Sequence, residues 1–140
     1  MASQQQSAGR IGRVAEHIVA AWILRNHDAW VSIMPDAASV DLLVQVRANP
    51  MRVLRVQVKA VYTTAAGFRT VNLTKSDGSR YTESDIDFIV ACDPDTLTNW
   101  VFPVSFARRF GRLRLRKLWS GYAYGWSEES PMFGGWTIRS

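Results

Sequence analysis

Two runs of alternating apolar and polar residues, separated by a short turn, dominate the middle of the sequence. The first run covers residues 41–46 and the second covers residues 54–61, and both are rich in Val and Leu. Between them, Asn49-Pro50 is a turn signal. Because a period of two is typical of a strand with one buried face, this pattern predicts a β-hairpin.

The turn decides which residues of the two predicted strands face each other. If the turn centres near Asn49, position 41 falls opposite position 57 in an antiparallel pair. Asp41, Gln57 and Lys59 then share one face of the sheet. A carboxylate, an amide and an ammonium group converge there. The simpler alternative is an exposed pair of Asp41 and Lys59 on a solvated face, which contributes less than about 1 kcal/mol.

The N-terminal segment changes from a polar to a helical pattern. Residues 1–7 are polar and are expected to form a flexible end, whereas residues 8–25 repeat apolar side chains every three or four positions. Gly12, Glu16 and Ala20 form a mostly small line along this predicted helix, which allows it to approach a sheet closely. Glu16 is the acid on that line. A solvated helix residue is the ordinary interpretation of a lone Glu.

Shorter strands and loops are predicted through the rest of the chain. The predicted strands cover residues 30–34, 68–73 and 100–104. Residues 81–90 are expected to form a helical turn followed by a strand, and residues 91–99 have the composition of a hairpin loop. Pro103 lies within the last predicted strand and cannot donate to a ladder, so we expect an edge strand there.

The last third of the chain is basic and then aromatic. Between Phe106 and Leu118 the sequence has no acid, and its cations alternate in part with leucines, which is typical of a strand with one basic face. The six cations are Arg108, Arg109, Arg112, Arg114, Arg116 and Lys117. A solvated basic face is the ordinary interpretation, but cations without counter-charges repel one another, so we favour contacts with phosphates. Six such contacts with DNA predict a log–log salt dependence of binding with a slope of about −5.

The aromatic residues from Trp119 to Trp136 have two interpretations. They either stack on unpaired bases or pack against the core or a second subunit, and packing is what we expect.

Composition restricts the partners and the compartment. A chain of 140 residues is expected to form one domain, and a net charge of +5 favours a polyanionic partner. No apolar run reaches the roughly 18 residues of a membrane span, and the N-terminus lacks a signal-peptide pattern, so we expect no membrane partner. Cys92 is the single cysteine, which favours a reducing, cytoplasmic location. One Cys and two His are too few for a structural zinc site.

Three stretches of the chain together resemble the PD-(D/E)XK nuclease superfamily. Asp41, followed after fifteen residues by Gln-Val-Lys at 57–59, is similar to the active-site motif in its variant with glutamine as the middle residue. The segment 12–16 resembles the first helix of these enzymes, in which a Glu completes the metal site. The Tyr-Thr…Asp-Ile-Asp-Phe segment, residues 81–88, resembles a stretch found in a subset that includes intron-encoded homing endonucleases of cyanobacterial type.

The resemblance implies a restriction-endonuclease-like α/β fold, with a central mixed β-sheet flanked by helices. Residues 8–105 correspond to the nuclease core, and residues 106–140 form a basic and aromatic extension of the same domain. The implied activity is cleavage of double-stranded DNA with Mg²⁺, for which Mn²⁺ can substitute. Asp36 follows a proline and is a second candidate for the aspartate of the motif. We prefer Asp41, because it stands at the mouth of a strand and opposite Gln57.

The resemblance also implies roles for individual residues. Asp41, the side-chain carbonyl of Gln57, the backbone carbonyl of Val58 and Glu16 are the expected metal ligands. Lys59 is expected to orient the attacking water or to take part in its deprotonation. Because Gln57 replaces an acid, Glu16 matters more for metal binding than in the acidic variant. Candidate DNA contacts are the six cations above together with Lys75 and Arg80 of the loop at 74–80.

Three functions remain open at this point. The first is a sequence-specific homing endonuclease, which cuts a linear duplex that carries its target. The second is a structure-selective nuclease such as a Holliday-junction resolvase, which cuts a four-way junction. The third is a catalytically inactive DNA-binding domain, which cuts neither. Because one active site cuts one strand, the first function implies a homo-oligomer, either a dimer or a tetramer.

Overall fold

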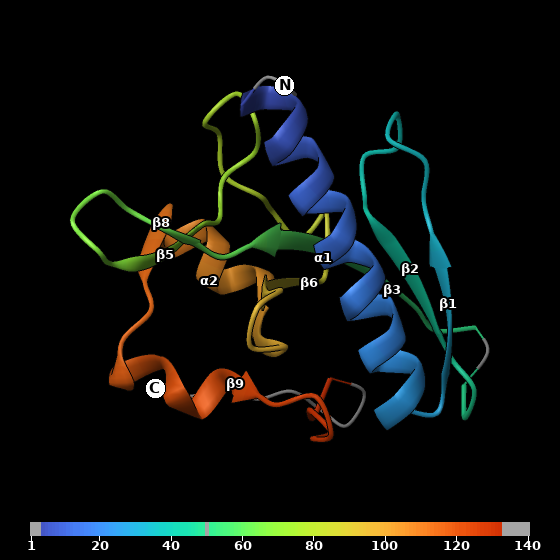
Figure 1. The fold of residues 1–140 in the computed structure, drawn as a ribbon. Coiled ribbons are helices and arrows are strands. Elements are labelled where there is room, and N and C mark those ends of the chain that lie inside the picture. The colour runs from blue at the N-terminus through green and yellow to red at the C-terminus, as the bar shows by residue number, and fades with distance from the viewer. Residues whose placement is uncertain (1–3, 50, 133–140) are drawn as a thin grey trace.

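A long helix crosses one face of a six-stranded sheet in the computed structural model, which describes residues 4–49 and 51–132 (Figure 1). The helix is α1 (Gln4–Asn26). The strands are β1 (Ala29–Ile33), β2 (Leu42–Val46), β3 (Val53–Ala60), β6 (Phe88–Asp93), β7 (Thr98–Pro103) and β9 (Ala123–Tyr124). They lie in the order β1-β2-β3-β6-β7-β9, with β3 and β6 parallel and the other pairs antiparallel. The predicted fold class, α/β with a mixed sheet, is confirmed.

Smaller elements lie on the other side of the large sheet. A second sheet has the order β4-β5-β8 and consists of β4 (Tyr62–Thr63), β5 (Arg69–Asn72) and β8 (Arg112–Arg114). Two short helices, α2 (Val104–Arg109) and the 3₁₀ helix η1 (Lys117–Tyr122), complete the described part of the chain. None of the helices within these residues is long and apolar enough to cross a membrane.

The predicted hairpin is present with the predicted register. Leu42 lies opposite Val56 and Gln45 lies opposite Val53, so that position 41 falls opposite position 57. Along both strands, alternate side chains are buried against α1. This alternation fixes the register, because a slip of one residue would turn the apolar side chains of both strands to solvent.

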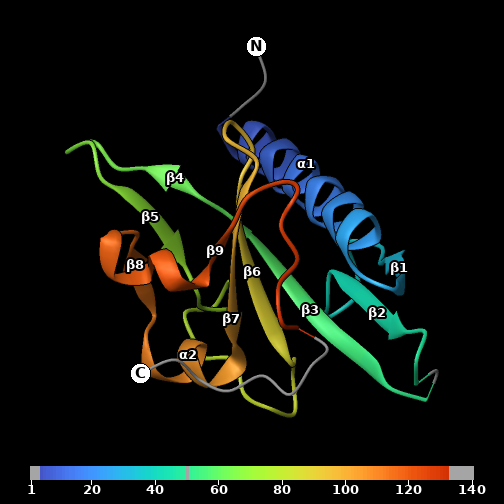
Figure 2. The same cartoon turned by 90° about the horizontal axis from the view of Figure 1, so that it is seen from below.

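Two clusters of buried side chains fill the two faces of the large sheet. One lies between α1 and the sheet and includes Trp22, Val44 and Val56. The other lies over β6 and β7 and includes Phe102 and Phe106. Figure 2 shows α1 on one side of these strands, and α2 and β8 on the other. Each large apolar side chain buried here contributes about 1.5–3 kcal/mol, which holds both layers against the sheet.

Two stretches outside the predicted helix at 8–25 are helical. One is the start of α1, which begins at Gln4, within the segment 1–7 that was expected to form a flexible end. The other is α2, which includes Phe106, at the start of the basic run at 106–118; the rings of Phe106 and Phe110 lie at helical spacing with centroids 5.7 Å apart. The expectation that part of this run is a strand with one basic face is confirmed by β8, in which Arg112 and Arg114 are exposed and Leu113 is buried.

The strand that contains Pro103 is not an edge strand. β7 lies between β6 and β9, and β9 pairs only with Asn99 and Trp100. Pro103 stands at the end of β7, beyond that pairing, so its missing N–H costs no bond to β9. The loop predicted at 91–99 is also shorter, because β6 runs on to Asp93.

The C-terminal aromatic residues pack against the core, as expected. Tyr122 and Tyr124 are buried, and Trp119 and Trp126 pack against the two clusters. Phe133 and Trp136 lie outside the described residues. The same segment is tied to α1, where the indole N–H of Trp22 donates to the carbonyls of Gly125 at 3.1 Å and Glu128 at 3.0 Å.

Candidate active site

The candidate site lies at the start of β2, where β3 continues beyond its last residue paired with β2 and leaves a gap in the strand pairing. Pairing between the two strands ends at Leu42 and Val56, whereas β3 runs on to Ala60. Asp41 fills this gap, and its Oδ2 accepts a hydrogen bond of 2.8 Å from the backbone N–H of Val58. The N–H and C=O of one residue in a strand point to the same side. The carbonyl of Val58 therefore points into the same gap as the carboxylate of Asp41.

Glu16 reaches the same carboxylate from α1. The carboxyl groups of Glu16 and Asp41 lie close enough to shift the pKa of each other. Partial burial and the negative charge of Asp41 raise the pKa of Glu16 to about 7. Burial raises the pKa of Asp41, while the hydrogen bond from Val58 and the charge of Lys59 lower it. Two acids so close together favour a proton or a cation between them.

Lys59 is the second charged group that interacts with Asp41. Burial lowers the pKa of the Lys59 ammonium, and the charge of Asp41 raises it. Its Nζ lies 5.5 Å from the ring centroid of Tyr81. Tyr81 is buried, and that burial raises the pKa of its hydroxyl to about 12. The Tyr81 side chain beside the lysine is therefore uncharged. The Lys59 ammonium thus lies near the carboxylate of Asp41 and the face of the Tyr81 ring.

Gln57 lines a cleft of about 550 Å³ together with Lys59, Tyr81 and Arg55. The Oε1 atom of Gln57 is buried and has no hydrogen-bond partner within residues 4–49 and 51–132. A buried carbonyl oxygen without a partner costs about 1–3 kcal/mol, so this atom is suited to a ligand that the protein chain alone does not supply.

The oxygen atoms around the gap fit a hard divalent cation. In the part of the chain that the structure describes, no three or more His, Cys, Asp and Glu side chains gather at one point. The available donors are two carboxylates, from Glu16 and Asp41, with the amide oxygen of Gln57 and the carbonyl of Val58. A set made only of oxygen atoms suits Mg²⁺ or Mn²⁺ rather than zinc.

Asp36, the second candidate for the aspartate of the motif, lies at the margin of this site. Its side chain is 79% exposed and pairs with Arg13 of α1. Its charge still raises the pKa of both Glu16 and Asp41. Asp41, by contrast, is bonded directly to the backbone of β3.

Arg55 and Tyr81 support the cleft but were not predicted as site residues, whereas Asp87 was expected to tie loops together. Arg55 binds Asp87 through its backbone N–H at 2.8 Å, and its guanidinium also donates to the carbonyls of Glu83 and Ser84, both at 2.7 Å. These bonds hold the loop before β6 against β3. Tyr81 and Asp87 both belong to the segment 81–88, which was the signal available in the sequence.

The predicted DNA contacts fall into exposed and paired groups. Arg112 and Arg114 are exposed on β8, and Arg116 and Lys117 are exposed just beyond it. Arg114 lies over the ring of Phe68, with its Cζ 3.6 Å from the ring centroid. The strands β5 and β8 lie on the opposite side of β3 and β6 from β1 and β2 (Figure 1).

Two of the remaining predicted contacts have acidic partners, and this corrects, for Arg108, the expectation of cations without counter-charges. Arg108 pairs with Glu83 at 2.7 Å, and Lys75 pairs with Asp85 at 3.1 Å. The Cζ of Arg109 lies 5.2 Å from the ring centroid of the neighbouring Phe110. The guanidinium of Arg80 lies beside Gly111, in the space that a Cβ would need.

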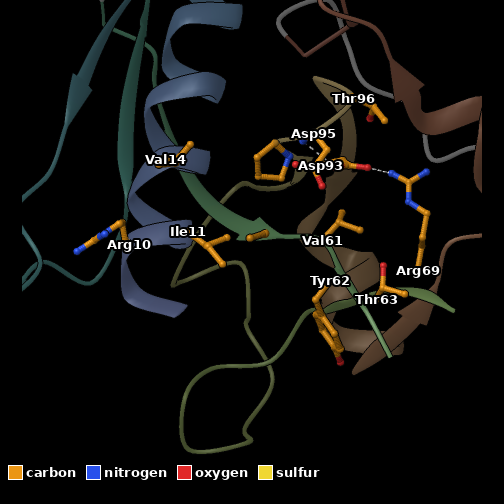
Figure 3. Close-up of a pocket in the computed structure, with 12 residues that line it drawn as sticks. Arg10, Ile11, Val14, Val61, Tyr62, Thr63, Arg69, Asp93, Asp95 and Thr96 are labelled. Atoms are coloured by element: carbon orange, nitrogen blue, oxygen red, sulfur yellow. Dashed lines mark hydrogen bonds and ion pairs between the residues drawn. The ribbon is translucent and has the colours of Figure 1, made fainter. Parts of the chain in front are cut away.

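A larger cavity lies away from these residues. It measures about 820 Å³ and lies between the N-terminal half of α1, β4 and the turn after β6 (Figure 3). Its lining is mainly apolar, and two of its charged residues, Arg69 and Asp93, pair with each other. None of the predicted catalytic residues lines it, so its size does not make it the candidate active site.

Comparisons with known proteins agree with the fold. No protein-family model matches the chain, and no curated protein matches it in sequence. Among solved structures, the fold is similar to that of a bacterial homing endonuclease, I-Ssp6803I, with a TM-score of 0.63 and 21% sequence identity. The similarity covers 87% of this chain and 89% of that chain.

Proposed function

We propose that this chain is a metal-dependent endonuclease that hydrolyses phosphodiester bonds in double-stranded DNA, with a PD-(D/E)XK site in which Gln57 is the middle residue. The observation that carries the proposal is the linked group of Glu16, Asp41 and Lys59 at the gap between β2 and β3. The fold similarity to a bacterial homing endonuclease supports a homing activity.

Mg²⁺ is the proposed cofactor, and Mn²⁺ is expected to substitute. Asp41, Glu16, the side-chain carbonyl of Gln57 and the backbone carbonyl of Val58 would hold it. When bound, the cation lowers the pKa of a water molecule and neutralises charge that develops on the phosphate. The two carboxylates supply its negative ligands, and the neutral amide of Gln57 makes the site weaker than one with three acids.

Lys59 is the proposed partner of the attacking water. Its Nζ lies over the ring of Tyr81 and near the charge of Asp41, where it can donate a hydrogen bond to a water or to a phosphate oxygen. Burial lowers its pKa, and this makes transfer of a proton at Nζ easier than for an exposed lysine.

The exposed cations are the proposed phosphate contacts. The side chains of Arg112, Arg114, Arg116 and Lys117 present positive charge to solvent. A chain with one such site cuts one strand, so we propose a homo-oligomer, a dimer or a tetramer, that cuts both strands of a duplex.

The proposal is tested with DNA of defined forms. Purified protein is incubated with a plasmid library that carries random inserts, and with a four-way junction, in Mg²⁺ and in EDTA. We expect cutting of duplex plasmid at a defined sequence in Mg²⁺ alone, and loss of cutting but not of binding in Asp41→Ala and Lys59→Ala. Either variant cutting at the wild-type rate overturns the assigned site. Selective cutting of the junction supports the structure-selective alternative, and binding without cutting supports an inactive domain.

A further inference from the structure

The face of β1, β2 and β3 that points away from α1 is open to solvent. Trp30 is 62% exposed and Val53 is 46% exposed, and Ser32 and Gln45 are exposed as well. The elements that cover this side of the large sheet, α2 and the small sheet, lie over β6 and β7 instead (Figure 2). A Trp left in water forgoes most of the roughly 2–3 kcal/mol that burial of so large a ring would contribute.

The strand register arranges these side chains in rows. Trp30 pairs with Gln45, and Gln45 pairs with Val53, so the three form one row across the strands. The next row on the same face consists of Ser32, Leu43 and Arg55. We call these six residues the outer sheet face.

The outer sheet face runs directly into the candidate active site. Leu43 and Arg55 line the same cleft as Gln57 and Lys59. Gln57 lies two residues beyond Arg55 on the same face of β3. A molecule that enters the cleft and extends along the hairpin must therefore pass over this face.

The charge and chemistry of the face match DNA. Its six side chains include no acid, and its one cation, Arg55, is paired with Asp87, so the exposed positive charge near the face comes from Arg47 and Arg52, near the tip of the hairpin. The Cζ of Arg47 lies 5.7 Å from the ring centroid of Trp30, and the nearby acid Asp28 is already paired with Arg47 at 3.1 Å. An amide such as that of Gln45 matches adenine in the major groove, and an apolar ring matches the methyl group of thymine.

We propose that the outer sheet face lies in the major groove of the duplex beside the scissile phosphate and reads base sequence there. The proposal rests on the nuclease function proposed above. The three strands of the face span about 10 Å between the outer two axes, and the major groove is about 12 Å wide. Val53 lies four residues from Gln57, a span of about 13 Å, so its row falls about four base pairs from the bond that is cut.

A tethered cleavage reagent tests where the face lies. Cys92 is buried, so a cysteine introduced by Ser32→Cys is the accessible thiol for attachment of iron–EDTA. The duplex is one that wild-type protein binds, selected from a random library. We expect the tethered iron to cut this duplex within about 10 base pairs, one helical turn, of the native cleavage site. The matched control is Ala21→Cys, which places the reagent on an exposed position of α1 and is expected to cut no defined position.

Trp30→Ala supplies a second readout. We expect about a tenfold loss of affinity for the selected duplex with an unchanged salt slope, because the ring neutralises no phosphate. If wild-type protein cuts DNA but the reagent at position 32 gives no defined cut and Trp30→Ala binds normally, the inference is overturned while the proposed function stands. If Trp30→Ala instead lowers the oligomer mass, the face contacts a second copy and the inference is wrong. A wild-type protein that neither binds nor cuts DNA overturns both proposals.

Discussion

The carboxyl groups of Glu16 and Asp41 interact at the point where α1 crosses the open end of the β2–β3 hairpin, and each shifts the pKa of the other. One acid comes from the helix and the other from the mouth of a strand, so the pair exists only when both elements are in place. Burial and mutual repulsion raise the pKa of Glu16 to about 7. The pair therefore forms only when α1 and β2 are correctly placed, and its two acidic groups favour binding of a cation.

Binding of a divalent cation should stabilise the folded protein. At a concentration of Mg²⁺ 100-fold above its Kd, we expect the free energy of unfolding to rise by about 2.7 kcal/mol, because the ion binds the native state alone. Asp41→Asn should abolish this increase, as measured by thermal unfolding in Mg²⁺ and in EDTA. Asp36→Asn is the matched control and should retain it. The opposite result for the two variants would make Asp36 the ligand.

Replacement of the half-buried Lys59 should reduce the rate of DNA cleavage without changing DNA affinity. We expect Lys59→Ala to reduce the rate of DNA cleavage by a factor of about 10²–10⁴, the range of a lost proton-transfer group, while DNA affinity is kept. Single-turnover cleavage and mobility-shift assays measure the two effects. Arg25→Ala removes an exposed cation of α1 and should leave both unchanged. Equal losses of binding and cleavage in Lys59→Ala would mean that this residue is only a phosphate contact.

Exposed and paired arginines should differ in the salt dependence of binding. Each phosphate contact contributes about 0.9 to the log–log slope, so the double change Arg112→Ala and Arg114→Ala should reduce its magnitude by about 1.8. Arg108→Ala should change the slope less, because Glu83 already neutralises that guanidinium. Titrations from low to moderate salt give the slopes. A slope that is unchanged in the double variant places the DNA away from β8.

His27 should make the fold sensitive to acid. Burial lowers the pKa of His27 below its ordinary 6.5, against the opposing charge of Glu129. The unfolded chain then binds more protons than the native one below about pH 6.5, so the free energy of unfolding should fall as the pH drops through that value. Glu16, whose pKa is raised to about 7, contributes a slope of opposite sign over the same range. The contribution of His27 is therefore measured as the difference between wild type and His27→Gln in denaturant titrations between pH 5 and 7.

The matched control for His27 is the other histidine of the chain. His17 is exposed on α1, so His17→Gln should keep the slope that His27 causes. A slope that is the same in wild type and in His27→Gln would assign the acid sensitivity to other groups. His27 also binds Ser130, with 3.1 Å between its Nε2 and the serine Oγ, so both variants need the same check of their folded state.

Local patterns predicted the hairpin well because its geometry is set within a few residues. The alternation of β2 and β3 and the turn between them fix the pairing of Leu42 with Val56, and thereby the place of Asp41 opposite Gln57. The approach of Glu16 came from the resemblance of its helix to that of known nucleases. Its contact with Asp41 then follows in the structure.

Contacts between distant segments were beyond the reach of such patterns. Pairing of β5 with β8, which places Thr70 opposite Arg114, joins residues far apart in the chain. The helical spacing of Phe106 and Phe110 was hidden by the more regular Arg–Leu alternation that follows it. The exposure of Trp30 depends on which part of the sheet α2 covers, and no alternation within β1 reveals that.

Anomalous scattering from crystals grown with Mn²⁺ locates the cation directly and so tests the central claim, that Glu16, Asp41, Gln57 and Val58 surround one metal site. We predict a peak about 2.2 Å from oxygen atoms of Asp41 and Gln57, at the gap between β2 and β3. A fully occupied peak elsewhere, such as at Asp36, with none at Asp41, would contradict it.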